Sequence, residues 1–175
     1  MKEEQGFAVW ITGIPSSGKS SITRELVVKL KAQGIATAVF ESDQMRRILT
    51  PAPSYSTDER DRFYGILARI GQVMTQQRIN VIFDATANKR LYRDLARELI
   101  PRYIEAYLQC PLELCMQRDP KGIYRGAQEG QIAFVPGLQV PYEPSLHPEI
   151  TLDCREAPAM NADTLVSLLR SRKYI

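Results

Sequence analysis

The chain has 175 residues, of which 44% are hydrophobic and 25% charged, and its formal net charge is +3. This size and composition predict one compact domain, residues 1–175, with a core of its own. The small net charge gives no reason to expect nucleic acid or a membrane surface as a partner. No run approaches the ~18 apolar residues of a spanning helix, and the polar start of the chain is unlike a signal peptide. We therefore expect a cytoplasmic protein.

Short apolar runs alternate with helix-like segments from the beginning of the chain. Residues 7–13 form a β-branched and aromatic run that ends in glycine, which is typical of a buried parallel strand. Residues 20–34 follow with apolar side chains on one helical face and end at Gly34, where a helix C-cap is expected. Residues 35–43 predict a second strand that ends in an acidic residue.

The same alternation continues to the C-terminus. Helices are expected at 58–78, 88–100, 111–118 and 161–175, and strands at 79–85, 102–110 and 149–153. Asn161 is the expected N-cap of the last helix. Alternating strands and helices predict a three-layer α/β fold, with a parallel sheet of about five strands and helices on both faces.

A nucleotide-binding motif lies between the first strand and the first helix. The spacing of Gly13, Gly18, Lys19 and Ser20 fits G-x-x-x-x-G-K-[ST], in the strand–loop–helix context that this motif requires. In such a loop, backbone N–H groups face the phosphates of ATP, Lys19 reaches the β- and γ-phosphates, and the Ser20 hydroxyl binds Mg²⁺. The fold is therefore predicted to be of the P-loop NTPase type. The residues expected to bind the nucleotide in this loop are Gly13, Ser16, Ser17, Gly18, Lys19, Ser20 and Ser21.

Acidic residues end the second and third strands, and arginines follow each of them. In a doubly wound sheet, ligands bind outside the C-terminal strand ends. We therefore assign Asp43 as the base for an attacking hydroxyl and Asp84 to Mg²⁺ through its water shell. Arginines there can hold an anionic acceptor, although solvated helix faces for the arginines, and strand-end or N-cap positions for the acids, remain open. The arginines are Arg46, Arg47, Arg90 and Arg93.

The cysteines and the single histidine limit other chemistries. Cys110, Cys115 and Cys154 form no C-x-x-C pair, and we expect buried thiols rather than a disulfide or a metal site. His147 is the only histidine, which argues against His-based zinc sites and Ser-His-Asp catalysis.

Residues 119–148 show no sustained period and are rich in glycine and proline. Loops of this length without regular structure are usually functional or disordered, and aromatic residues such as Tyr124 and Phe134 argue against disorder. We expect a lid that closes over the nucleotides and excludes water during phosphoryl transfer. Phe134 either stacks on an adenine or packs the lid on the domain.

The motifs together resemble the adenylylsulfate kinase family, whose members phosphorylate the ribose 3′-hydroxyl of adenosine 5′-phosphosulfate (APS) with ATP. "GIPSSGKSS" is similar to the phosphate loop of that family, and "ESDQMRRIL" matches its D-G-D-N-V-R-x-G-L at Asp43, Arg46 and Leu49. "CPLELCMQRDPKGIY" and "VPYEP" resemble the family's P-L-E-x-C-x-x-R-D-x-K-G-L-Y and the end of its lid. The resemblance runs over residues 10–153.

This resemblance implies roles for individual residues. Asp43 would lie near the acceptor hydroxyl, Arg46 on the acceptor, and Arg118 and Lys121 along the ATP phosphates. The implied ligands are ATP, Mg²⁺ and APS, and a homodimer is left open. The expected catalytic residues are Asp43, Lys19 and Arg46, and the expected acceptor-binding residues are Asp43, Arg46, Arg90, Ile132 and Phe134.

The chain departs from the family pattern around the acceptor. Ser42 and Gln44 replace the usual Gly and Asn beside the base. "ATANKR" stands where the family has F-I-S-P-Y-R, so Arg90 is retained but Ala85 replaces a phenylalanine that contacts the acceptor. Loss of one base–aromatic stacking contact weakens the binding free energy by about 1–3 kcal/mol. A kinase for another small hydroxyl acceptor is therefore the second hypothesis, and a nucleotide-dependent regulator without phosphoryl transfer is the third.

Overall fold

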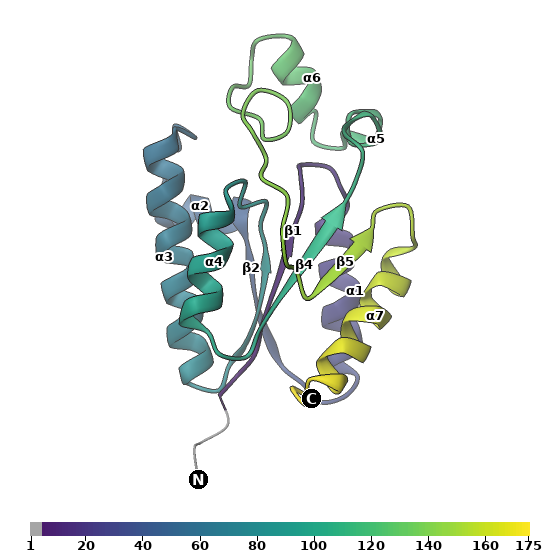
Figure 1. Ribbon diagram of the computed structural model, residues 1–175. Coiled ribbons are helices and arrows are strands. Elements are labelled where there is room, and N and C mark those ends of the chain that lie inside the picture. Colours follow the sequence, from purple (N-terminus) through teal and green to yellow (C-terminus); the bar gives the residue numbers. More distant parts are fainter. Residues whose placement is uncertain (1–4) are drawn as a thin grey trace.

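The computed structural model describes residues 5–175 as a five-stranded parallel sheet between two layers of helices (Figure 1). The strand order is β2-β3-β1-β4-β5, which confirms the predicted α/β fold of the P-loop type. None of the helices in this part of the chain combines the length and apolar character that a membrane span requires. The strands are β1 (Ala8–Thr12), β2 (Thr37–Glu41), β3 (Asn80–Asp84), β4 (Tyr103–Gln109) and β5 (Ile150–Asp153). The helices are α1 (Lys19–Lys31), α2 (Ser42–Leu49), α3 (Thr57–Gln76), α4 (Arg90–Leu99), α5 (Leu112–Arg118), α6 (Ile123–Gln128) and α7 (Pro158–Ser171).

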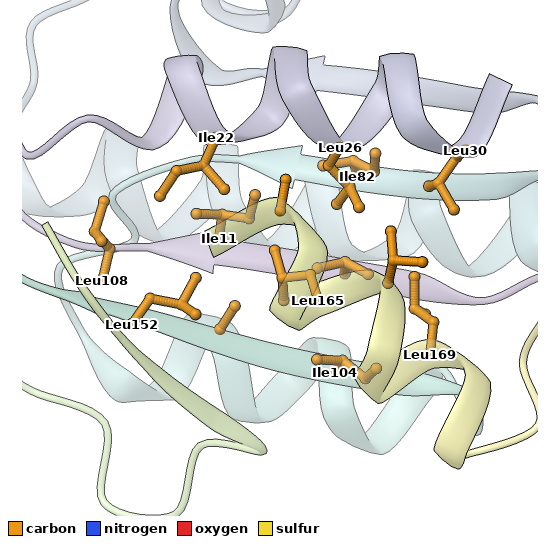
Figure 2. Close-up of a cluster of buried hydrophobic side chains, with 14 of the residues drawn as sticks. Ile11, Ile22, Leu26, Leu30, Ile82, Ile104, Leu108, Leu152, Leu165 and Leu169 are labelled. Atoms are coloured by element: carbon orange, nitrogen blue, oxygen red, sulfur yellow. The ribbon is translucent and has the colours of Figure 1, made fainter. Parts of the chain in front are cut away.

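On one face of the sheet, α1 and α7 cover a core of aliphatic side chains (Figure 2). Ile11, Ile82 and Ile104 contribute to this core from three adjacent strands. Leu26 of α1 and Leu165 of α7 lie in the same cluster. The apolar stripe that predicted the first helix is therefore the stripe that the fold buries.

The opposite face of the sheet is covered by α3 and α4 and is more aromatic. Trp10 of β1 stacks on Phe83 of β3 with 4.4 Å between the ring centroids, and Tyr64 of α3 lies beside them. A Cβ at Gly71 would lie 2.3 Å from Phe83 Cζ, so only a glycine lets α3 approach the sheet this closely. Because strand residues alternate between the two faces, Trp10 and its neighbour Ile11 belong to different layers.

Two of the differences from the expected element boundaries change the setting of a residue singled out in the sequence. α2 begins at Ser42, so Asp43 lies in the first turn of a helix rather than in the strand, where the helix dipole favours an acidic residue. α7 begins at Pro158, which is suited to a first helical position because it lacks an N–H group. Asn161 is therefore not the N-cap, and its side chain donates to Asp153 O at 2.9 Å instead.

The segment expected to form the lid contains one short helix, α6, in a region where the sequence showed no helical period. In Figure 1, α5 and α6 project beyond the C-terminal ends of the strands. The Tyr124 hydroxyl donates to Pro15 O at 2.9 Å, which attaches α6 to the loop after β1. A small buried cluster strengthens this attachment and consists of Ile14, Cys115, Tyr124, Ala127 and Val135.

Candidate active site

The loop between β1 and α1 has the geometry of an anion-binding site. Gly18 adopts φ 108° as the N-cap of α1, a conformation that favours glycine. A Cβ on Gly13 would lie 2.7 Å from Leu108 O, so the loop passes close to β4. The Oγ atoms of Ser16 and Ser17 are buried and have no hydrogen-bond partner within residues 5–175. Such orphaned polar atoms beside a helix N-terminus fit the phosphate groups of a nucleotide.

Lys19 lies inside this loop. Its Nζ donates to Gly13 O and to Ile14 O, at 2.9 Å in each case. Burial lowers the pKa of Lys19 below its usual value, and the negative charges of Asp84 and Asp43 partly oppose this shift. Because the hydrogen-bond acceptors are neutral carbonyls, the positive charge is available to an anionic ligand.

The loop forms one wall of a cleft of about 1070 Å³. The other walls come from the start of α2, the end of β3, the lid and the segment before α7. The structure therefore brings both predicted acids, Asp43 and Asp84, to the predicted phosphate loop. The polar residues that line the cleft outside the loop include Glu41, Ser42, Asp43, Gln44, Asp84, Thr86, Arg118, Lys121, Arg155 and Asn161.

The two residues expected to hold Mg²⁺ both line this cleft. Ser20 is exposed in the first turn of α1, and Asp84 is buried at the end of β3. Within the described residues, no group of three or more His, Cys, Asp and Glu side chains could hold a metal ion by itself. One hydroxyl and one carboxylate fit Mg²⁺, which keeps several waters and takes other ligands from substrate phosphates.

Asp43 and Lys121 face each other across the cleft. The Nζ of Lys121 lies 2.5 Å from Asp43 Oδ2 and 3.7 Å from Glu41 Oε1. The hydrogen bond to Asp43 raises the pKa of Lys121. Lys121, which we expected along the ATP phosphates, is therefore paired with the expected base in this structure.

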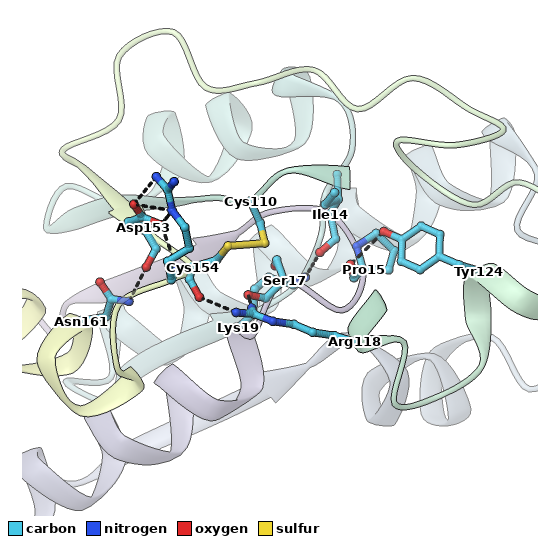
Figure 3. The surroundings of a disulfide bond; sticks show 11 residues. Ile14, Pro15, Ser17, Lys19, Cys110, Arg118, Tyr124, Asp153, Cys154 and Asn161 are labelled. Atoms are coloured by element: carbon cyan, nitrogen blue, oxygen red, sulfur yellow. Dashed lines mark hydrogen bonds and ion pairs between the residues drawn. A yellow bond between two sulfur atoms is a disulfide. The ribbon is translucent and has the colours of Figure 1, made fainter. Parts of the chain in front are cut away.

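Arg118 connects the phosphate loop to the opposite edge of the cleft (Figure 3). Its Nη1 donates to Ser17 O at 3.4 Å and its Nη2 to Cys154 O at 3.0 Å. The guanidinium thus lies against the loop that is expected to bind the phosphates.

Cys110 and Cys154 form a disulfide, so the expectation of free thiols was wrong for these two residues. They follow β4 and β5, two adjacent parallel strands, and the N–H of Cys154 donates to Gln109 O at 3.1 Å. Strand pairing brings their Cα atoms within 5.2 Å although they lie 44 residues apart. Because no short spacing marks such a pair, the sequence carried no signal for it. Cys115 is a buried free thiol, and burial raises its pKa.

Arg46 lies outside the walls of the cleft, buried between α2 and α3. Its guanidinium forms an ion pair with Glu59 and lies 4.1 Å from the ring centroid of Phe63. Glu59 also accepts a hydrogen bond from the backbone N–H of Tyr55. Arg46 therefore holds the loop before α3, and its charge is balanced by a carboxylate.

A second buried arginine, Arg60, was not among the predicted site residues. Its Nε donates to Tyr55 O at 2.9 Å, its Nη1 to Asn88 Oδ1 at 3.3 Å and its Nη2 to Phe134 O at 2.6 Å. Arg60 therefore joins the loop before α3, the loop before α4 and the lid. Its sequence context, a run of acidic and basic residues, is typical of a solvated helix face and so pointed away from this role.

The residues held by Arg60 include two exposed aromatic side chains. Tyr55 is 40% exposed and Phe134 is 46% exposed. Both have a left-handed backbone, with φ of 56° and 63°, which is uncommon for bulky residues. Sequence reasoning named Phe134 but missed Tyr55.

The residues that line the cleft do not include Arg90, Arg93 or Ile132, nor the two exposed aromatic residues Tyr55 and Phe134. The Nη1 of Arg90 donates to Pro144 O at 3.2 Å, on the segment that returns from the lid. Arg93 is fully buried, so it is not accessible to an acceptor. Ile132 is 37% exposed on the lid, where its Cδ1 would lie 2.8 Å from a Cβ on Gly126.

Comparison with known proteins gives one consistent result. The family described as adenylylsulphate kinase matches residues 5–153. The adenylyl-sulfate kinase of Rippkaea orientalis is 35% identical over 87% of this chain and 83% of its own length. That of Halothermothrix orenii is 31% identical over all of this chain and 95% of its own length. Among solved structures, the APS kinase of Mycobacterium tuberculosis in complex with AMPPNP and APS superposes with a TM-score of 0.90, at 28% identity over 95% of this chain and 98% of that one.

Proposed function

Because the chain belongs to the adenylylsulphate kinase family, we propose that it transfers the γ-phosphoryl group of ATP to the ribose 3′-hydroxyl of APS. The hydroxyl O–H bond and the bond from the γ-phosphorus to its bridging oxygen break, a new P–O bond forms, and ADP and a proton are released. The observation that carries the proposal is the convergence of the phosphate loop, Asp43 and Asp84 on one cleft. We expect this reaction in the cytoplasm, where ATP is available.

On the donor side, the phosphates bind the loop. Their oxygens accept hydrogen bonds from the backbone and from the unpaired hydroxyls of Ser16 and Ser17, with Lys19 at the β- and γ-phosphates. Ser20 would bind Mg²⁺ directly and Asp84 would bind it through its water shell, and the ion would neutralise charge on these phosphates. The adenine lies against residues 155–158, which also line this cleft.

Asp43 is the group that takes the proton from the acceptor hydroxyl. Its carboxylate stands in the first turn of α2, on the wall opposite the loop that holds Lys19. Lys121 pairs with this carboxylate in the structure. When the γ-phosphate is bound, Lys121 turns toward its greater negative charge, together with Arg118. The Asp43 carboxylate is then open to the incoming hydroxyl.

On the acceptor side, Tyr55 and Phe134 flank the adenine of APS. They supply the aromatic surface that Ala85 cannot supply, because Arg60 holds both by their backbones and leaves both rings exposed. Arg46 acts on the acceptor by holding Tyr55 in place through Glu59. Ile132 contributes to acceptor binding through the lid, and Arg90 contributes through the segment that returns from the lid.

A homodimer stays a prediction, which light scattering checks.

An ADP-release assay over a panel of acceptors tests the proposal. The panel contains APS, AMP, a sugar and an amino-acid alcohol, with ATP and Mg²⁺ constant and Lys19→Ala as the inactive control. We expect turnover with APS and none above the control with the others. Turnover with another alcohol but not with APS would support the second hypothesis. ATP binding without acceptor-stimulated ADP release would contradict a kinase of either kind.

A further inference from the structure

Arg93 is a charged residue with no contact to solvent, in the middle of α4. Its side chain is 0% exposed, and the N–H groups of its guanidinium point in three directions. Nε donates to Glu105 Oε1 at 2.9 Å, Nη1 donates to Ala87 O, and Nη2 donates to Glu143 O at 2.6 Å. One guanidinium therefore joins β4 to two loops.

The two loops that Arg93 holds are also bound to each other. They are the 86–88 turn, which precedes α4, and the strap, residues 141–144, which returns from the lid. Asn88 Nδ2 donates to Pro141 O at 3.0 Å, and the N–H of Glu143 donates to Asn88 O at 2.8 Å. Ala87, in the middle of the turn, has φ 43°, so its backbone needs outside support to keep this conformation.

This assembly leads directly to the acceptor side of the site. Asn88 Oδ1 accepts from Arg60, which in turn holds Tyr55 and Phe134. Thr86, at the other end of the turn, lines the cleft. A shift of the turn would therefore move both the cleft wall and the groups that carry the two exposed rings.

We propose that Arg93 is a positioning residue for the acceptor, which sets the 86–88 turn against the strap and thereby the distance between the two acceptor-binding aromatic residues. It touches neither substrate nor the reacting atoms. This inference rests on the proposed function for the identity of the acceptor. The planar guanidinium suits the task because its N–H groups leave it in fixed, divergent directions, whereas an ammonium is a point donor.

Arg93→Lys is the decisive variant, and Arg97→Lys is its matched control. Arg97 lies one turn further along α4 and pairs with the same Glu105, at 3.0 Å, and with Glu149. Within residues 5–175, its hydrogen bonds go to Glu105 and Glu149 and not to the turn or the strap. Both variants keep the positive charge, so both perturb the same ion cluster, but only the first replaces the guanidinium that bonds to both loops.

Steady-state kinetics are measured with ATP and whichever acceptor supports turnover of the unchanged protein. For Arg93→Lys we expect the KM of the acceptor to rise about tenfold or more, while the KM of ATP changes less than about twofold. For Arg97→Lys both constants should stay within about twofold. An equal rise in both KM values, no rise in either, or the same acceptor effect in Arg97→Lys would overturn the proposal.

A second measurement needs no substrate. Trp10, the only tryptophan, donates its indole N–H to Ala85 O at 3.1 Å, immediately before the turn. We expect its emission to shift in Arg93→Lys and not in Arg97→Lys, and an unchanged emission in both would count against the proposal. If the panel shows no kinase activity, the proposed function fails while this measurement still tests the support of the turn.

If Arg93→Lys does not fold, the same kinetics are measured on a variant that lacks the buried ion pair. The double variant Arg93→Gln/Glu105→Gln removes both members of the ion pair, so neither is left buried and unpaired. It also lacks the three-way link, and we expect the same selective rise in the KM of the acceptor. An acceptor KM equal to that of the unchanged protein would overturn the proposal.

Discussion

The ammonium of Lys121 lies 2.5 Å from the Asp43 carboxylate, so a lid residue reaches across the cleft to the expected base. The two residues are 78 positions apart in the chain. Both side chains are about half exposed, so solvent or a ligand can compete for either partner. The pair therefore connects the position of the lid with the availability of the base.

Asp43→Asn should lower kcat by about 100-fold or more, because the amide cannot accept the acceptor proton. ATP affinity should change little, since the phosphate loop is untouched. Single-turnover kinetics and a nucleotide titration measure the two effects separately. Rates equal to those of the unchanged protein would remove Asp43 as the base.

Burial lowers the pKa of Lys19 below the usual lysine value of 10.5. As the pH is raised, the affinity for ATP should therefore begin to fall at a lower pH than it would with an ordinary lysine. The ammonium is present below its lowered pKa and is lost as the pH rises through it. Nucleotide titrations from about pH 7 to about pH 10 would measure this loss. Lys19→Arg should remove the alkaline loss, since a guanidinium keeps its charge over this range. Parallel curves for the two proteins would contradict the assignment.

Arg46→Ala should raise the KM of the acceptor more than that of ATP, because Tyr55 loses the support that Glu59 and Arg46 give it. It should also lower the free energy of unfolding by about 3 kcal/mol, since it leaves the largely buried carboxylate of Glu59, 12% exposed, without its partner. Arg46→Met combined with Glu59→Gln should recover part of this stability. Denaturant titrations and steady-state kinetics check both effects, and an equal rise in both KM values would count against an acceptor role.

Tyr55→Ala and Phe134→Ala should each weaken acceptor binding by about 1–3 kcal/mol, the range for one base stacked on one ring. Replacing either residue by another aromatic, as in Tyr55→Phe, should leave the affinity nearly unchanged. Calorimetric titration of the acceptor in the presence of a non-hydrolysable ATP analogue measures the loss. Equal affinities for the alanine and aromatic variants would show that the rings do not contact the base.

Reduction of the Cys110–Cys154 disulfide should lower the free energy of unfolding by about 2–4 kcal/mol, because the bond closes a loop of 44 residues. The fold should persist, since β4 and β5 are also paired through their backbones. The double variant Cys110→Ser/Cys154→Ser should be insensitive to dithiothreitol, whereas Cys115→Ser should retain the response. Identical unfolding midpoints of the unchanged protein with and without reductant would contradict this prediction.

The phosphate loop and the α/β class were predictable because their signals are local. The spacing from Gly13 to Ser20 is contiguous, and the apolar runs show directly which segments become buried. Asp43 and Asp84 could be assigned to the cleft for a related reason. Parallel strands end at the same edge of a sheet, so residues that follow such strands must gather there.

The fate of the arginines and cysteines depended on tertiary structure. A charged residue looks the same in sequence whether it is solvated, like Arg47, or buried among carbonyl groups, like Arg93. The contact from Arg60 to Phe134 spans 74 residues, and that from Arg93 to Glu143 spans 50. No local pattern encodes such contacts, because packing of distant segments decides which side chains lose water and which partners replace it. The sequence alone therefore predicted the phosphate loop, and only the fold decided which residues surround the proposed acceptor side.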